Sequence, residues 1–179
     1  NCLFYASKNE IVYLDFSSNA GGTVKLYNCT IAGPSDQAGK PAMSTKYGTI
    51  TIKNCALFAY DGTIPINNVA SASTITVSYS ATSYATLAGT GNVTSLTYTS
   101  QFESVSSGTL DYRAKSGGGI LDVGTDLSAD SPAITTDIVG TSRPQNSTFD
   151  IGCWELVVAG GGSFPMGARS HRYPSIGRH

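Results

Sequence analysis

The chain has 179 residues and a formal net charge of −1 at pH 7, and only 13% of its residues are charged. This length allows one domain with a sizeable core, and the low charge together with 20 glycines is typical of a β protein. No apolar stretch reaches the roughly 18 residues of a membrane-spanning helix. The basic residues are too few and too scattered for a nucleic-acid-binding surface.

A short motif recurs three times in the first third of the chain. The motif is an Asn-Cys pair, found at Asn1-Cys2, Asn28-Cys29 and Asn54-Cys55. Its copies begin at positions 1, 28 and 54, so the spacing is 27 and then 26 residues. A fixed period of roughly 20–30 residues indicates stacked repeats, none of which buries its apolar face alone.

Alternating β-branched residues predict strands at 49–52 and 74–77, which are 25 residues apart, and residues 22–27 repeat the pattern of 48–53. A further strand is predicted at 92–98. The strands should place three pairs of side chains in inward columns: Val24 and Leu26, Ile50 and Ile52, and Ile75 and Val77. Because turn formers separate the strands and no segment has helical periodicity, we expect an all-β fold, a right-handed parallel β-helix or solenoid.

The repeated Asn-Cys pair has a structural interpretation. An Asn at the same bend of successive turns can form hydrogen bonds along the axis and satisfy backbone groups that the bend leaves unpaired. The neighbouring Cys is interpreted as a small buried apolar filler; a disulfide between stacked thiols is the alternative, for which in-register geometry is poor. No metal site is predicted, because the chain has no C-x-x-C pair and both histidines lie near the C-terminus.

From about residue 99 the sequence changes character. It runs through Leu110-Asp111-Tyr112-Arg113, a Gly-rich stretch at 117–124, the block 137–144 and the block 149–155. These blocks, in this order over about residues 90–156, resemble the closing segment of bacterial and phage right-handed parallel β-helix repeat proteins. The usual pattern there is D-Y-R-L, G-S-P-A-I-D-x-G, T-D-x-x-G-x-x-R-P and D-I-G-A-x-E. In this chain Ser131-Pro132-Ala133-Ile134 follows the Gly-rich stretch, and Cys153 replaces the usual Ala.

Three regions are therefore expected: parallel β-helix turns at 1–110, a capping segment at 111–158, and a linker and tail at 159–179. A cap is needed because the open end of a solenoid exposes apolar columns and unpaired strand edges. Apolar residues of the segment should close the core, and four charged residues should form a paired polar lock. The residues assigned to the cap are Asp137, Arg143, Phe149, Asp150, Trp154 and Glu155.

No catalytic residues and no cofactor are predicted. Glycoside hydrolysis needs two carboxylates facing one groove. Asp36 stands 8 residues after Asn28 and Asp61 stands 7 after Asn54, so the two acids should lie near one another, with Tyr60 beside them. Turn-forming Asp is the first interpretation of both, since each follows a turn sequence. Contact with a glycan through Asp36, Asp61 and Tyr60 is the first alternative; Ca²⁺ contact and catalysis by the two acids are the others.

The last residues differ from the rest of the chain in charge. Glu155 is the last acid, and three arginines follow it, so residues 156–179 carry +3 and residues 1–155 carry −4. After the Gly-rich linker 159–163, the tail alternates apolar and basic side chains. We expect such an extended peptide to dock on a neighbouring subunit; a disordered terminus is the alternative. The partner-binding residues assigned to the tail are Phe164, Met166, Arg169, Arg172 and Tyr173.

These features together favour a non-enzymatic structural and interaction module of an extracellular or virion (phage) surface assembly. Its expected partners are protein subunits of the same assembly in a homo-oligomer. A carbohydrate-active β-helix that binds or cleaves surface polysaccharide is the main alternative, and a bacterial adhesin is a third.

Overall fold

The computed structural model describes residues 1–5, 11–17, 21–33, 41–59, 64–69 and 73–157. Within these residues the only helix is a three-residue 3-10 helix, η1 (Tyr98–Ser100), which confirms the predicted all-β class. The strands are β1 (Cys2–Tyr5), β2 (Val12–Asp15), β3 (Thr23–Tyr27), β4 (Cys29–Ala32), β5 (Met43–Lys46), β6 (Thr49–Lys53), β7 (Ala56–Phe58), β8 (Ile66–Asn68), β9 (Thr74–Ser78), β10 (Phe102–Ser104) and β11 (Asp111–Ala114).

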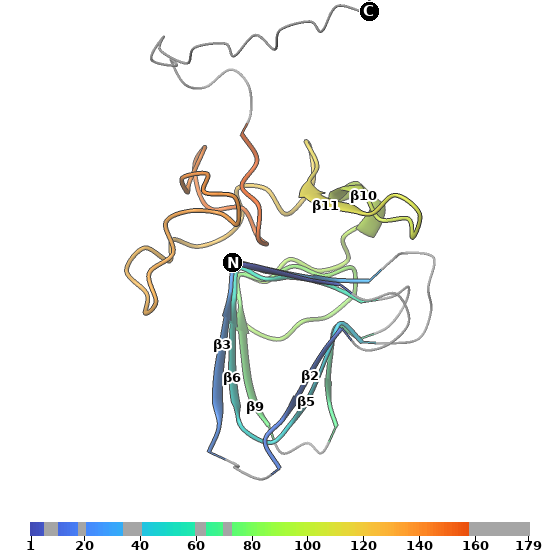
Figure 1. The fold of residues 1–179 in the computed structure, drawn as a ribbon, viewed down its shortest axis with the longest axis vertical. Coiled ribbons are helices and arrows are strands. Elements are labelled where there is room, and N and C mark those ends of the chain that lie inside the picture. Colours follow the sequence, from blue (N-terminus) through green and yellow to red (C-terminus); the bar gives the residue numbers. More distant parts are fainter. Residues whose placement is uncertain (6–10, 18–20, 34–40, 60–63, 70–72, 158–179) are drawn as a thin grey trace, which may run out of the picture.

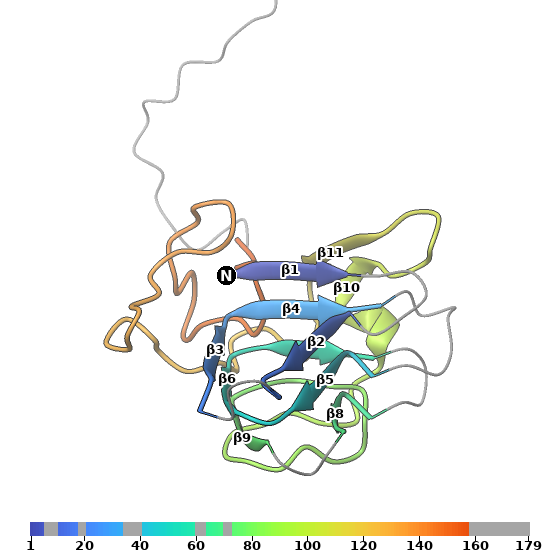
Figure 2. The same ribbon diagram turned by 60° about the horizontal axis from the view of Figure 1, so that its bottom comes forward.

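Nine of these strands form three separate parallel sheets of three strands each. The strand orders are β1-β4-β7, β2-β5-β8 and β3-β6-β9, so each strand pairs with the third strand before or after it. Figure 1 shows the three sheets as the sides of a triangle, and Figure 2 shows the paired strands lying next to one another in order. Parallel pairing is the arrangement that the repeat spacing predicts.

The predicted inward columns are confirmed by the strand register. Val24 pairs with Ile50 and Ile50 with Ile75, while Leu26, Ile52 and Val77 form the neighbouring column. Ile50 and Ile52 are fully buried, whereas the alternate residues of β6, Thr49, Thr51 and Lys53, are exposed or partly exposed. Five of the six residues, all but Val24, belong to one apolar cluster, so burial of alternate apolar side chains holds this sheet in its register.

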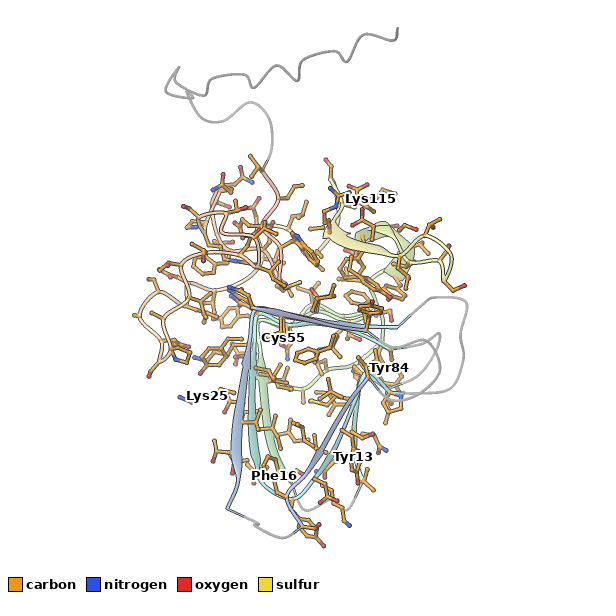
Figure 3. All side chains as sticks on the ribbon, in the orientation of Figure 1. Tyr13, Phe16, Lys25, Cys55, Tyr84 and Lys115 are labelled. Carbon is orange, nitrogen blue, oxygen red and sulfur yellow. The ribbon has the colours of Figure 1, made fainter. Side chains whose placement is uncertain are left out.

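The repeated Gly before β3 and β6 has a packing reason. The Phe16 ring lies at the corner between β2 and β3 (Figure 3), and a Cβ atom added at Gly22 or Gly48 would collide with that ring. Gly48 also has a φ of +80°, a conformation that disfavours other residues. The corner therefore needs Gly where the large ring closes the end of the core.

The predicted strand at 92–98 is wrong. In this stretch Val93 makes one isolated parallel bridge to Ala81, which itself bridges Ala56 of β7, and η1 begins at Tyr98. Ser95 has a φ of +59°, which interrupts extended backbone. The alternating pattern is real, but the left-handed residue within it prevents a continuous strand.

Residues 98–156, which we call the C-terminal layer, pack on the outer face of the β1-β4-β7 sheet (Figure 1). The layer consists of η1, the antiparallel pair β10-β11 and mostly irregular chain. It lies against the face of a sheet, whereas the sequence interpretation places its later part, 111–158, over the end of the stack. The reason is that β4 and β7 are buried on both faces: Ala32, Ala56 and Phe58 pack against the layer, and Thr30 accepts a hydrogen bond from it.

Aromatic side chains form the contact between this sheet and the layer. Phe58 of β7 is fully buried; its ring stacks on Tyr98 with centroids 5.0 Å apart and meets Phe102 edge-on at 5.3 Å. The Tyr98 hydroxyl donates to the carbonyl of Gly33. Large aromatic area and edge-to-face geometry both stabilise such a contact, so the layer is an integral part of the core.

Candidate functional site

The Asn of the second and third Asn-Cys repeats lies at a bend of the backbone. Asn28 and Asn54 have φ angles of 48° and 51°, and Tyr79, the equivalent residue after β9, has 48°. Asn enters this left-handed region more easily than most residues. The left-handed bend after β3 and after β6 therefore explains why both of these copies of the repeat have Asn at this position.

The asparagine amides contact the C-terminal layer. The Nδ2 of Asn54 donates to the Thr125 carbonyl at 2.7 Å, and its Oδ1 accepts from the Thr125 N–H at 2.9 Å. The Nδ2 of Asn1 donates to the carbonyl of Thr136 at 2.7 Å. The amide of Asn28 is buried and has no hydrogen-bond partner among the described residues. The predicted chain of Asn hydrogen bonds along the axis is thus wrong.

The cysteines provide the hydrogen bonds along the stack. The N–H of Cys29 donates to the Sγ of Cys55 at 3.4 Å, and the N–H of Cys55 donates to the Oγ of Ser80 at 3.1 Å. Cys29, Cys55 and Ser80 also donate to the carbonyl two residues earlier, that of Tyr27, Lys53 and Ser78 respectively. The expectation of a purely apolar filler is therefore incomplete, because each thiol satisfies a backbone group at the bend.

All four cysteines are free thiols. Cys2 is exposed at the end of the column, whereas Cys29, Cys55 and Cys153 are buried. Burial raises the pKa of the Cys55 thiol well above its ordinary value and raises that of Cys153 to about 11. Protonated, buried thiols are poor nucleophiles, so Cys55 and Cys153 have the character of structural residues.

Replacing Cys55 tests this column. Cys55→Ala should lower the free energy of unfolding by about 2 kcal/mol, because the buried N–H of Cys29 loses its acceptor. Cys55→Ser should lower it clearly less, since the Ser80 hydroxyl already makes the same two hydrogen bonds one turn further on. Urea unfolding of both variants measures the difference. Equal losses would show that the thiol contributes only volume.

Four charged residues assigned to the cap meet in the C-terminal layer, and we call them the polar cluster: Asp137, Arg143, Asp150 and Glu155. The Nη1 of Arg143 lies 2.9 Å from the Oε2 of Glu155, and the two side chains are 0% and 1% exposed. Arg143 also donates to the carbonyls of Asp150 and Gly152, each at 2.8 Å. The two Asp carboxylates accept backbone N–H groups, including that of Glu155 at 3.1 Å and that of Leu156 at 2.7 Å.

Burial dominates the electrostatics of this cluster. It raises the pKa of the Asp150 and Glu155 carboxyls and lowers the pKa of the Arg143 guanidinium. Opposite charges counteract burial for all three groups, and backbone hydrogen bonds also do so for the two carboxyls. A cluster of this kind fixes the conformation of the irregular chain around it, because its side chains form hydrogen bonds with backbone groups from several segments.

The two aromatic residues assigned to the cap lie in different surroundings. Phe149 is 2% exposed, packs with Tyr27 and Leu127, and has the Arg143 guanidinium 5.9 Å from its ring. Trp154 is partly buried against the cluster on the outer face of the β1-β4-β7 sheet. It therefore remains available to line a surface pocket.

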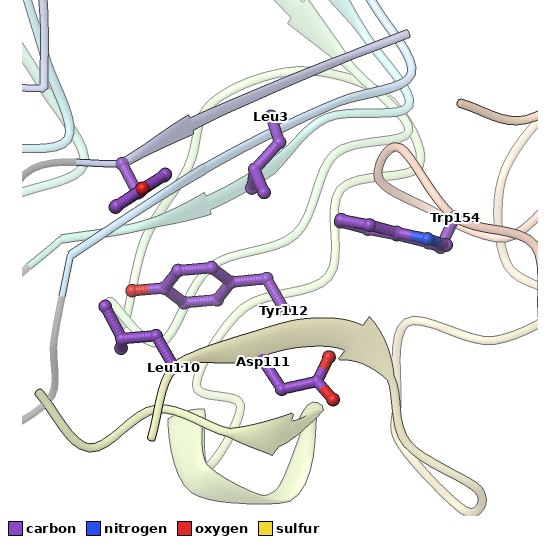
Figure 4. A pocket seen from close by; sticks show the side chains of 6 residues that line it. Leu3, Leu110, Asp111, Tyr112 and Trp154 are labelled. Carbon is purple, nitrogen blue, oxygen red and sulfur yellow. The ribbon is translucent and has the colours of Figure 1, made fainter. Parts of the chain in front are cut away.

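That pocket has a volume of about 280 Å³ and lies between β1 and β11. Figure 4 shows Leu3 of β1 on one side, Tyr112 and Leu110 on the other, and Trp154 at one end. Tyr5 and Asp111 complete the lining. Tyr5 is 62% exposed, with its ring centroid 6.4 Å from that of Tyr112. The pocket thus combines apolar and aromatic walls with one carboxylate.

The carboxylate of Asp111 is oriented by its neighbour. Arg113 donates to it through Nε at 2.9 Å and through Nη2 at 2.5 Å. The side-chain hydrogen bond from Arg113 lowers the pKa of Asp111, so this carboxyl is ionised at neutral pH. Of the residues that line the pocket, only Trp154 was predicted as a site residue from the sequence, although the block Asp111-Tyr112-Arg113 was a signal for this region.

Several assigned residues lie outside the described part of the chain: the possible glycan contacts Asp36, Tyr60 and Asp61, and the tail residues Phe164, Met166, Arg169, Arg172 and Tyr173. Within the described residues no group of three or more His, Cys, Asp or Glu is arranged to hold a metal ion. The same residues contain no helix long and apolar enough to cross a membrane.

Comparison of the chain with protein-family models, with curated proteins and with solved structures finds no match. The functional interpretation therefore depends on the residues of this chain and their geometry.

Proposed function

We propose that this chain is a non-enzymatic structural and interaction module of an extracellular or virion surface assembly, in which it forms a homo-oligomer. We also propose that its three sheets are the faces of a right-handed parallel β-helix. The β-helix proposal is supported by the parallel pairing of each of the nine strands β1 to β9 with the third strand before or after it. It is supported as well by the repeat spacing of 25–27 residues.

The observation that carries the structural role is the burial of strands β4 and β7 on both faces of the β1-β4-β7 sheet. Ile31 and Leu57 are buried on one face, and Ala32 and Phe58 are buried on the other, against the C-terminal layer. Hydrogen bonds also join strands and layer, such as that from the Cys153 N–H to the Thr30 hydroxyl at 3.0 Å. Sheets covered in this way resist deformation, which suits a rigid spacer or decoration.

The homo-oligomeric part of the proposal is tested by solution mass. Light scattering after gel filtration should give a multiple of the 18.6 kDa chain mass for residues 1–179. A variant that ends at Val158 should give the monomer mass, because it lacks the basic tail that complements the acidic body. Raising the salt concentration should weaken the full-length oligomer, since the attraction between exposed charges is screened.

A monomer mass for both the full-length chain and the shortened variant would contradict the homo-oligomeric proposal. If the shortened variant were still an oligomer, the chain would assemble through a surface other than the tail. Circular dichroism of the shortened chain serves as the control for folding.

A second candidate function is binding of surface polysaccharide, cleavage being its enzymatic form. The observation in its favour is the exposed ring of Tyr5 near Trp154 and the Asp111 carboxylate, since flat rings and carboxylates are typical of saccharide sites. Titration of polysaccharide into the chain tests this function through the fluorescence of Trp154, because Trp154 lines the same pocket.

A further inference from the structure

The pocket between β1 and β11 has a specific occupant, we infer: the C-terminal tail of a second copy of this chain, inserted through an apolar residue of 164–173. This inference rests on the proposed homo-oligomeric function and adds the surface that the tail meets.

The lining of the pocket selects an apolar side chain. Leu3, Leu110 and the rings of Tyr5, Tyr112 and Trp154 form its walls. The volume of about 280 Å³ is slightly below the range of about 300–1,000 Å³ typical of small-molecule sites. A single large side chain presented by a peptide fits such a space better than a whole oligosaccharide, which would also need several polar partners.

The charge of the folded body favours a basic segment. Asp111 lies at the edge of the pocket, but Arg113 donates to both oxygens of its carboxylate, so the attraction comes from the body as a whole rather than from this one group. At longer range, residues 1–155 carry −4. An apolar side chain flanked by cations is therefore attracted to this surface.

The tail has the required composition. Phe164, Met166 and Tyr173 supply large apolar side chains, and Arg169 and Arg172 lie among them without any acid after Glu155. A pocket that accepts the tail of its own chain can also accept the identical tail of a second copy. Exchange of an identical element between two copies is a low-cost route to assembly. The pocket and the tail are thus two halves of one contact between copies.

Trp154 makes the contact measurable. It is the chain's one tryptophan and lines the pocket, so its fluorescence reports on occupancy. Titration of a synthetic peptide of residues 159–179 into the chain that ends at Val158 should give a saturable change in Trp154 emission. Tyr5→Ser should weaken this binding by about tenfold or more, because aromatic residues carry much of the energy of such contacts. Since Tyr5 is 62% exposed, this change leaves the fold intact.

A matched control and a peptide variant sharpen the test. Tyr13→Ser removes another exposed tyrosine, 51% exposed on β2 and outside the pocket lining, and should leave the titration unchanged. A peptide with Phe164→Ser, Met166→Ser and Tyr173→Ser should bind at least tenfold more weakly than the natural sequence. In the full-length chain, Tyr5→Ser should shift the light-scattering mass to that of the monomer.

Other outcomes would overturn the inference in distinguishable ways. If the tail is needed for the oligomer but the peptide leaves Trp154 emission unchanged, the inference fails and the proposed function stands. If the full-length chain is a monomer whose Trp154 emission matches that of the peptide complex, the pocket holds its own tail and both proposals of a second copy fail. If polysaccharide changes the emission and the peptide does not, the occupant is a saccharide.

Discussion

Replacing Arg143 with methionine should lower the free energy of unfolding by about 3–5 kcal/mol, the cost of breaking a buried ion pair from one side. The Glu155 carboxylate would keep its backbone donors, the N–H groups of Gln145 and Asp150 at 2.9 and 3.1 Å, but would lose its opposite charge in a site where it is 1% exposed. The carbonyls of Asp150 and Gly152 would lose their donor as well. The irregular chain of the C-terminal layer depends on these contacts.

The control is the exposed pair. Arg113→Met removes an arginine that also bonds a carboxylate, that of Asp111, but its side chain is 64% exposed, so the expected loss of stability is much smaller than for Arg143→Met. The double variant Arg143→Met with Glu155→Gln should recover part of the loss, because it removes the unpaired charge. Urea unfolding followed by circular dichroism measures all three. Similar losses for Arg143→Met and Arg113→Met would contradict the assigned role of the polar cluster.

Asn54→Ala should cost about 3 kcal/mol. The substitution leaves both backbone groups of Thr125 without their partner; the cost is roughly 1–3 kcal/mol for a fully buried group and is nearer the lower end for these part-buried ones. It also places Ala at a φ of 51°, where Asn is tolerated better. The bend between β6 and β7 and its attachment to the C-terminal layer are therefore weakened by the same change.

Two variants separate these causes. Asn54→Gly removes the hydrogen bonds but accepts the left-handed backbone, so it should cost less than Asn54→Ala. Asn146→Ala removes an exposed amide that contacts Asp122 at 3.3 Å, and its effect should stay within about 0.5 kcal/mol. Thermal and urea unfolding provide the measurement. If Asn54→Ala proved as harmless as Asn146→Ala, the amide would not join the strands to the layer.

Much of the strand structure could be predicted because its signal is local. Ile50, Ile52, Ile75 and Val77 alternate with polar residues at the period of a strand, and the repeat spacing aligns them. The same reasoning failed at 92–98, where a single left-handed residue, Ser95, interrupts the strand. Propensity does not reveal such a residue, since serine is common in strands and turns alike.

The candidate sites were less accessible to prediction. The blocks around Arg143 and Glu155 correctly indicated charged residues that meet, because the motif lies within a short span of sequence. The pocket was missed because Leu3 and Tyr5 come from the first strand, while Asp111 and Trp154 come from the layer. Nothing in a local pattern shows which distant segments will lie beside each other.

By itself, the sequence determined the all-β class, the parallel pairing of strands one repeat apart and the inward columns, because strand periodicity and repeat spacing are properties of short stretches. Only the tertiary structure decided that the C-terminal layer covers the face of a sheet and that Asn54 bonds to Thr125, 71 residues away. It likewise decided that the Cys55 thiol accepts the Cys29 N–H of the preceding repeat and that a pocket forms beside β1. These features depend on which apolar faces remain uncovered after the sheets have formed, and therefore on the packing of the whole chain.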